Sequence, residues 1–243
     1  MILMDIKDVN FKSVDFWFKG KNELIDILIK KVAMKKKIKI LNVGCGTADD
    51  LNVLLKYGDV TLVDKNKSVL ELIKNKSIKK YIGDGRNLRF KDGSFDIVLM
   101  FDVLEHIKED DIAIKEAHRV LKNCGYFIFI VPAFQFLFSS HDRALDHYRR
   151  YNINEIREKL NNLFEIQEIG YWNFILFVPI ALSRLIKKSS QENVRIEIPS
   201  SFIRKILGKI LEIDNLLIKK DFHLPFGLSI YGIARKVNTD GIK

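Results

Sequence analysis

The sequence has little cysteine, and its two cysteines stand far apart. Cys45 and Cys124 form neither a CxxC pair nor a Cys/His spacing among the 243 residues. These absences exclude a disulfide-stapled fold and a zinc or redox motif, so no metal is expected, and they favour a reducing, cytoplasmic setting. The N-terminal MILMDIKDVNFK alternates apolar and charged residues. It lacks the continuous apolar segment of a secretory signal, so we expect the protein to stay inside the cell.

Long apolar runs are also absent. The strongest one, residues 174–182, contains Pro179 and is far shorter than the roughly 20 residues of a membrane span. We therefore expect no transmembrane helix. No internal repeat or low-complexity segment is visible, and the length fits one domain better than two.

Basic residues are in excess, because 41 Lys plus Arg against 31 Asp plus Glu give a net charge of +10. This charge permits an anionic partner such as nucleic acid, a lipid headgroup or a phosphorylated molecule. The lysines are spread along the whole chain, with only short clusters at residues 35–37 and 187–188. Nucleic-acid binding would need a contiguous basic stripe, so the pattern argues against it and leaves a peripheral membrane contact open.

From Ile38 onward, short apolar runs alternate with helical patterns. This order is typical of repeated βαβ units and predicts an α/β fold with a doubly wound, mostly parallel sheet. Gly58 is expected to end the first helix after the first strand, and Ser68 to cap the next one. Strands are expected at residues 38–43, 60–63, 81–82, 95–100, 126–131, 165–172 and 228–235, with later helices at 112–121 and 154–163.

Residues 1–243 are interpreted as one domain with two helical additions to its sheet core. Residues 1–36 contain an amphipathic helix, which either forms a lid over the ligand edge of the sheet or packs on its outer face. The other expected parts are a core made of residues 37–179 and 223–237 and a basic insertion at 180–222, whose two helices are joined by a polar linker at 189–192.

The run ILNVGCGTADD places Gly44 and Gly46 between a buried strand and a helix, where an open α/β sheet binds its ligand. Asp64 ends the second strand 20 residues after Gly44 (64 − 44), the spacing of a carboxylate that binds ribose. The alternatives are a plain tight turn and a solvated acid. Asp49 stands where a dinucleotide motif has its third glycine, with Asp50 beside it. Acids suit a sulfonium and an ammonium group better than a pyrophosphate.

Four segments follow one another along residues 37–132: ILNVGCGTA, TLVD, YIGDGRNLRFKDGSFDIVLMFDVLEH and HRVLKNCGYFIFIVP. In this order they resemble the successive motifs of class I S-adenosylmethionine-dependent methyltransferases. The resemblance implies a Rossmann-like methyltransferase fold with an antiparallel last strand. It also implies S-adenosylmethionine as cofactor and S-adenosylhomocysteine as product.

The resemblance assigns the expected cofactor residues. Gly44 and Gly46 would hold the methionine part, Asp64 the ribose and Asp84 the adenine side. The other residues of the expected cofactor site are Phe101 and Asp102, which would pass under the cofactor, and their neighbours Cys45, Lys65, Gly85 and Arg86.

The chain departs from the family pattern at two positions. Asn42 replaces the usual Asp or Glu, and Ala48 replaces a common third glycine. In DVLEH, the family implies a mainly structural role for Glu105 and His106, with a catalytic role as the alternative.

Ionisable and aromatic residues are interleaved after the fifth strand, in FQFLFSSHDRALDHYRRY. His141 and His147 are candidate general bases, since an imidazole can accept a proton at neutral pH. Arg149 and Arg150 could clamp an anionic acceptor, with packing as the alternative. The pattern HDxxLxHxRRY, with FWFKGK and LPFGLS elsewhere, also resembles a subgroup of these methyltransferases. The remaining residues of the expected acceptor site are Asp142, Tyr148, Trp17 and Lys21.

The expected function is methyl transfer from S-adenosylmethionine to a small-molecule or lipid-linked acceptor by direct displacement. Such a displacement depends chiefly on aligning the acceptor with the methyl carbon. Two alternatives remain open: an RNA methyltransferase, and a non-catalytic nucleoside-binding module associated with a membrane surface.

Overall fold

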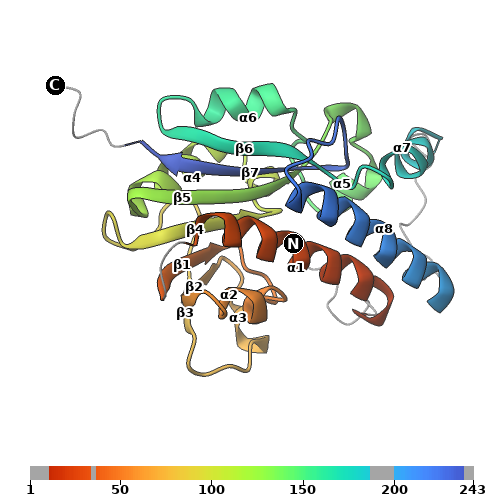
Figure 1. Ribbon diagram of the computed structural model, residues 1–243. Coiled ribbons are helices and arrows are strands. Elements are labelled where there is room, and N and C mark those ends of the chain that lie inside the picture. The colour runs from red at the N-terminus through yellow and green to blue at the C-terminus, as the bar shows by residue number, and fades with distance from the viewer. Residues whose placement is uncertain (1–10, 34–36, 187–199, 238–243) are drawn as a thin grey trace.

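The computed structural model describes residues 11–33, 37–186 and 200–237, and its centre is one seven-stranded sheet (Figure 1). The strand order is β3-β2-β1-β4-β5-β7-β6. β7 runs antiparallel to β5 and β6, and the other pairings are parallel. This confirms the predicted α/β fold and its antiparallel last strand. The strands are β1 (Ile38–Val43), β2 (Gly58–Asp64), β3 (Lys79–Ile82), β4 (Phe95–Phe101), β5 (Leu121–Pro132), β6 (Phe164–Trp172) and β7 (Ser229–Lys236).

The central strands read as continuous apolar runs because helices cover both faces of the sheet. One buried cluster joins the sheet to α1, α2, α3 and α8, and a second joins it to α4 and α6. In Figure 1, α1 and α8 lie side by side across the front of the sheet. The helices are α1 (Phe11–Val32), α2 (Leu51–Leu54), α3 (Lys67–Leu72), α4 (Asp110–Val120), α5 (Ser140–Ala144), α6 (Ile153–Leu160), α7 (Phe177–Ile186) and α8 (Ser201–Lys219), with short 3-10 helices η1 (Leu104–His106) and η2 (Gln135–Leu137).

The strand order reverses between β1 and β4. From β1 the chain first builds outward to β2 and β3, and it then returns to the other side of β1 with β4. Side chains after the carboxyl ends of β1 and β4 therefore face the crevice where open α/β sheets bind their ligands.

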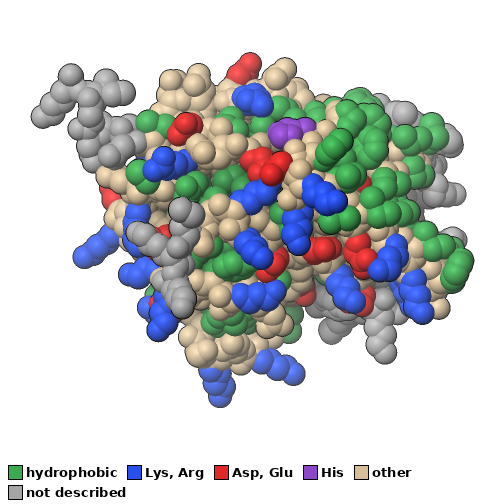
Figure 2. Space-filling model, viewed as in Figure 1, with side chains coloured by type: hydrophobic (Ala, Val, Ile, Leu, Met, Phe, Trp, Pro, Cys, Tyr) green, Lys and Arg blue, Asp and Glu red, His purple; other side chains and the backbone are tan. Residues whose placement is uncertain are grey.

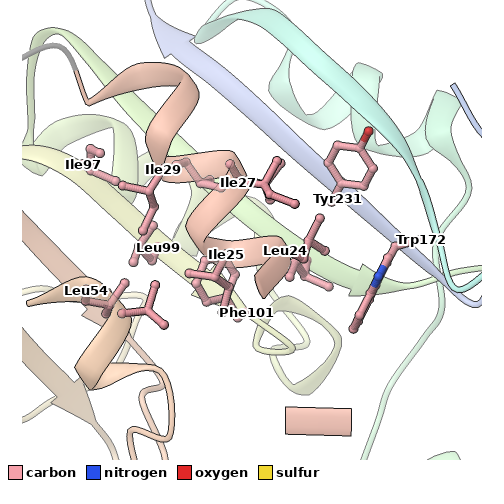
Figure 3. Close-up of a cluster of buried hydrophobic side chains, with 14 of the residues drawn as sticks. Leu24, Ile25, Ile27, Ile29, Leu54, Ile97, Leu99, Phe101, Trp172 and Tyr231 are labelled. Carbon is pink, nitrogen blue, oxygen red and sulfur yellow. The ribbon is translucent and has the colours of Figure 1, made fainter. Parts of the chain in front are cut away.

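The C-terminal half of α1 belongs to the core. Leu24, Ile25 and Leu28 are fully buried, and Figure 3 shows Leu24 and Ile25 among side chains of the sheet, with Phe101 and Trp172 nearby. For this half of the helix, packing on the sheet is the correct alternative.

A buried asparagine fixes the pairing of α1 with α8. Asn215 Nδ2 donates to the carbonyl oxygen of Gly20 at 2.9 Å, and its Oδ1 accepts from Trp172 Nε1 at 2.9 Å. Gly20 faces Leu211, and a Cβ built on Gly20 would lie 2.9 Å from the Cβ of Leu211. The glycine therefore permits the close approach of the two helices.

Two expected helix boundaries were wrong. Gly58 does not end a helix but begins β2, where it pairs with Ile38 on the neighbouring strand. Only glycine fits so close to that strand, because a Cβ at residue 58 would lie 1.9 Å from the carbonyl oxygen of Ile38. Ser68 does not cap α3; the cap is Asn66, whose side chain accepts from the Ser68 amide.

The two helices of the predicted insertion are present as α7 and α8. The expected linker at 189–192 lies outside the described residues. Among the helices that the structure describes, none is long and apolar enough to cross a membrane.

Candidate functional site

The turn after β1 requires glycine for two reasons. Gly44 and Gly46 have φ values of +67° and +52°, in the left-handed region that other residues avoid. A Cβ on Gly44 would also lie 2.5 Å from a methyl group of Val103, which follows β4. The Gly44 and Cys45 amides donate to the carbonyl oxygen of Val63, at 2.8 and 3.1 Å. The turn is thus held between the ends of β2 and β4.

Asp64 ties this turn to the end of β2. Its Oδ2 accepts from the Gly46 amide and its Oδ1 from the Asn66 amide, both at 2.8 Å. The neighbouring Lys65 is exposed. The expected ribose-binding acid and glycine turn are therefore in direct contact.

The loop after β3 closes the same edge of the sheet. Gly85 is buried, and a Cβ there would lie 3.3 Å from Val43 at the end of β1. Asp84 pairs with Arg86 at 2.7 Å, and Arg86 also pairs with Glu109 at 2.6 Å. The hydrogen bonds from Arg86 lower the pKa of Asp84, so this carboxylate stays charged beside the predicted cofactor turn.

A further carboxylate, that of Asp50, lies below the turn and is not among the site residues expected from the sequence. Asn42 Nδ2 donates to both oxygens of Asp50, at 3.1 and 2.9 Å, and both residues are buried. Burial raises the pKa of Asp50 to about 6. The negative charge that Asn42 lacks is thus supplied by its neighbour, Asp50.

The N-terminal half of α1 reaches the end of β4. Lys21 Nζ lies 2.5 Å from Asp102 Oδ2 and 6.0 Å from the centre of the Phe101 ring. Burial alone would lower the pKa of Lys21, but the charges of Asp102, Asp50 and Glu105 raise it above its usual value. Lys21 therefore groups with the predicted cofactor residues rather than with the acceptor segment.

Trp17, one turn earlier on α1, packs against Trp172. Their ring centres lie 5.2 Å apart, and Trp17 is half-buried. This contact anchors the start of the helix beside the ligand edge.

The loops after β4 and β5 meet around a buried carboxylate. The Tyr148 amide donates to the Glu105 carbonyl oxygen at 2.8 Å. The His106 and His147 rings pack edge to face, with centres 4.5 Å apart. Glu105, His106 and His147 each place a potential ligand atom within 4.8 Å of those of the other two. Burial, and then the charge of Asp102, raise the pKa of Glu105 well above its usual value.

Asp142 holds the acceptor segment together. Its carboxylate accepts from Arg150 Nε at 2.8 Å and from an Arg184 nitrogen at 3.1 Å, and it lies 3.1 Å from His147 Nδ1. Burial alone would raise the pKa of Asp142, but these hydrogen bonds and charges lower it well below the usual range. Asp142 and Arg150 are buried and paired with each other. These contacts favour a supporting role for both residues, and their expected contact with an acceptor stays a prediction.

The other ionisable residues of the segment differ in their surroundings. Burial lowers the pKa of His141 to about 4. Arg149 donates to the Lys108 carbonyl oxygen at 2.7 Å and to Asp110 at 3.3 Å, which favours the packing alternative. Tyr148 is 57% exposed. Of the two predicted bases, only His147 has a carboxylate orienting its ring among the contacts that the described residues make.

Comparisons with known proteins point to the methyltransferases. The family described as "Methyltransferase domain" matches residues 41–129. Demethylmenaquinone methyltransferase of Staphylococcus aureus (strain JH9) is 30% identical over 177 residues, covering 60% of this chain and 73% of the relative.

Two solved structures show the same fold. Phosphoethanolamine N-methyltransferase 2 of Haemonchus contortus, in complex with S-adenosyl-L-methionine, has a TM-score of 0.60 at 18% identity and covers 96% of this chain and 59% of its own. The [4+2]-cyclase SpnF has a TM-score of 0.59 at 20% identity, covering 89% of this chain and 81% of its own. The fold by itself thus accommodates more than one reaction.

Proposed function

The chain belongs to the class I S-adenosylmethionine-dependent methyltransferases, and on this basis we propose that it transfers the methyl group of S-adenosylmethionine to a small-molecule acceptor. The observation that carries the proposal is the set of carboxylates around the glycine turn. Asp50 and Asp64 lie at this edge, with Asp102 nearby in an ion pair with Lys21. They attract the sulfonium and ammonium groups of S-adenosylmethionine and repel the pyrophosphate of a dinucleotide.

In this proposal each part of the cofactor has a partner. The backbone of Gly44 and Gly46 approaches the methionine part, and Asp50 attracts its ammonium group. Asp64 accepts hydrogen bonds from the ribose hydroxyls in exchange for its contacts with backbone amides. The Lys21 ammonium binds the methionine carboxylate, while Asp84 and Arg86 line the adenine side.

The acceptor lies on the other side of the methyl group, against the loops after β4 and β5. His147 is the residue we propose to remove the acceptor's proton. The anionic Asp142 keeps a proton on His147 Nδ1, so Nε2 carries the lone pair that can accept another. As the acceptor attacks, its bond to the methyl carbon forms, the carbon–sulfur bond breaks and the electron pair returns to sulfur. The name of the Staphylococcus aureus relative suggests a quinone-related acceptor.

Calorimetric titration with S-adenosylmethionine, S-adenosylhomocysteine and NAD tests the cofactor. We expect saturable binding of the first two and none of NAD. Tighter binding of NAD would contradict the assignment. Incubation with methyl-labelled cofactor and a fractionated cell extract, followed by identification of the labelled product, then identifies the acceptor.

A separate observation supports contact with a membrane surface. Phe202, Ile206, Ile213 and Leu216 are between 44% and 70% exposed, and together they form what we call the α8 outer face. Figure 2 shows hydrophobic side chains gathered over α7 and α8, with Lys and Arg along their lower edge. An exposed apolar helix face bordered by lysines fits the interface of an anionic bilayer. We propose that this face rests on such a membrane, where a lipid-linked acceptor would be found.

A further inference from the structure

We propose that Glu105, His106 and His147 form a binding site for one divalent transition-metal cation on the acceptor side of the active site. The role of this cation in catalysis depends on the methyltransferase function proposed above; its binding does not. The proposal replaces the expectation that the protein has no metal site.

Three suitable ligands from two distant segments meet at the proposed site. Glu105 and His106 lie in η1 after β4, and His147 lies beyond α5 after β5. Their potential ligand atoms all lie within 4.8 Å of one another. The hydrogen bond from the Tyr148 amide to the Glu105 carbonyl oxygen, at 2.8 Å, ties the two segments together. A cation between the three side chains would therefore need only small adjustments of their rotamers.

The surroundings of the Glu105 carboxyl group also favour a bound cation. The residue has no exposed surface, and neither carboxyl oxygen has a hydrogen-bond partner within residues 11–33, 37–186 and 200–237. A buried carboxyl group without partners is costly, and such groups usually pair with a cation or coordinate a metal. The nearby Lys21 ammonium is hydrogen-bonded to Asp102 instead. Glu105 thus has the burial and the unused oxygens of a metal ligand.

Asp142 lies behind His147, on the side of the ring away from the proposed cation. Metal-binding histidines commonly donate their second ring N–H to a carboxylate, which fixes the tautomer and aims the other nitrogen at the metal. His147 Nδ1 lies 3.1 Å from Asp142 Oδ1, and Asp142 is itself held by Arg150 and Arg184. The arrangement leaves His147 Nε2 as the free ligand atom.

The ligand set also indicates which cation would bind. Two imidazoles and one carboxylate are typical of sites for Zn²⁺, Fe²⁺ and related ions, whereas Mg²⁺ prefers oxygen ligands. Three protein ligands leave coordination positions open for an acceptor. We therefore infer an acceptor with an ionisable hydroxyl group whose oxygen binds the cation.

The chemistry then balances without any further reactant. With its Nε2 bound to the cation, His147 would hold the metal instead of accepting the acceptor's proton as proposed above. The cation would lower the pKa of the bound hydroxyl, which would release its proton to solvent. The resulting oxygen anion attacks the methyl carbon and forms a carbon–oxygen bond. The carbon–sulfur bond breaks, its electron pair stays on sulfur, and the products are the methyl ether, S-adenosylhomocysteine and one proton.

The test is a titration of the chelator-treated protein, residues 1–243, with Co²⁺ and Zn²⁺, in the absence of cofactor and acceptor. Visible absorption of bound Co²⁺ reports nitrogen and oxygen coordination, and calorimetry gives the Zn²⁺ stoichiometry. We expect one cation per chain. Glu105→Gln and His147→Gln should each weaken binding at least tenfold, and Asp142→Asn should weaken it about 10- to 100-fold through His147.

His223→Gln is the matched control, because His223 is an exposed histidine far along the chain whose Nδ1 lies 3.0 Å from the Asp221 carbonyl oxygen. It should bind the cation as the wild type does. Circular dichroism and thermal melting show whether Glu105→Gln folds. If it does not, His147→Gln, at a less buried position, provides the comparison.

Absence of saturable cation binding by the wild type would overturn the proposal, as would equal binding by wild type, Glu105→Gln and His147→Gln. S-adenosylmethionine binding is measured on the same preparation. Cofactor binding without cation binding would leave the proposed function standing and remove the metal site. Cation binding without cofactor binding would leave the metal site standing and contradict the proposed function.

Discussion

The carboxylate of Asp50 lies where it would attract the proposed cofactor and where its negative charge lowers the stability of the fold. It is buried beside Asn42, and its pKa is raised from an ordinary value of 3.8 to about 6. The folded chain thus holds the proton of Asp50 more tightly than the unfolded chain does. The stability that this group contributes is complete below pH 4 and is lost as the pH rises from about 4 to 6.

Asp50→Asn should therefore stabilise the cofactor-free protein above pH 6. The pKa difference corresponds to roughly 3 kcal/mol at most. We expect an increase of about 2 kcal/mol in the free energy of unfolding at pH 7.5 and almost none at pH 4. The new amide can still accept the hydrogen bond from Asn42. Urea unfolding at both pH values measures the difference, and an equal effect at both would contradict a raised pKa.

Asp64→Ala should weaken binding of S-adenosylmethionine by roughly 1 to 3 kcal/mol, or about 5- to 150-fold. The substitution removes the proposed ribose acceptor and the hydrogen bond that holds the Gly46 amide. Calorimetry on the folded variant measures the loss. Asp59→Ala is the control, because Asp59 is an exposed acid on the same strand. Unchanged affinity in Asp64→Ala would show that the ribose is bound elsewhere.

The sequence predicts those site residues whose geometry is local. Gly44 and Asp64 are readable because a strand, a tight turn and a parallel neighbour fix their spacing along the chain. Asn42 and Asp50 are eight residues apart and meet only because the turn folds back. From the sequence alone, Asn42 in place of the family's usual Asp or Glu indicates only that a negative charge is missing. The cluster of Glu105 with His147 joins two loops after different strands, and no spacing rule links them.

At the scale of elements, the strands are the best-predicted parts. Buried parallel strands are short, continuous apolar runs, and each predicted strand overlaps an observed one. Helix ends are set by contacts instead. The role of Gly58 as the first residue of β2 becomes clear only from its close approach to Ile38 on the neighbouring strand.

At the contact of α1 with α8, replacing a glycine by alanine changes stability in two opposite ways, through tighter packing and through higher helix propensity. Both Gly20 and Gly208 lie inside helices, where alanine is intrinsically favoured by about 0.5 to 1 kcal/mol. A Cβ at Gly20 would lie 2.9 Å from the buried Cβ of Leu211, which has little room to move. Overpacking of this kind costs about 1 to 3 kcal/mol. Gly20→Ala should therefore lower the melting temperature.

Gly208→Ala is the matched control. A Cβ there meets only Phe16, at an ordinary 3.7 Å. The helix gain should then appear alone, as a stabilisation of about 0.5 to 1 kcal/mol. Thermal unfolding of both variants decides the matter. A stabilised Gly20→Ala would mean that α1 and α8 approach less closely than described.

At the scale of the whole molecule, charge and apolar surface act together. The net charge of +10 draws the chain toward any anionic surface, but it does not orient the protein. To orient the protein on a membrane, one face must lower its free energy by moving apolar side chains out of water. The α8 outer face has that property. Lys205 lies beside it on the same helix, and the exposed Lys209, which pairs with Glu212, lies within it.

We expect the protein to float with vesicles of phosphatidylglycerol and phosphatidylcholine at low salt. Binding should fall at 1 M salt, where the Debye length shrinks to about 3 Å. It should also fall when Phe202 and Ile213 are both replaced by serine, since their exposed apolar surface is the part that inserts. Replacing Ile112, which is 46% exposed on α4, by serine is the control and should leave flotation unchanged. If the wild type does not float at low salt, the membrane contact is wrong. If the α8 variant floats as well as the Ile112 variant, the charge alone attracts the protein and the α8 outer face does not insert.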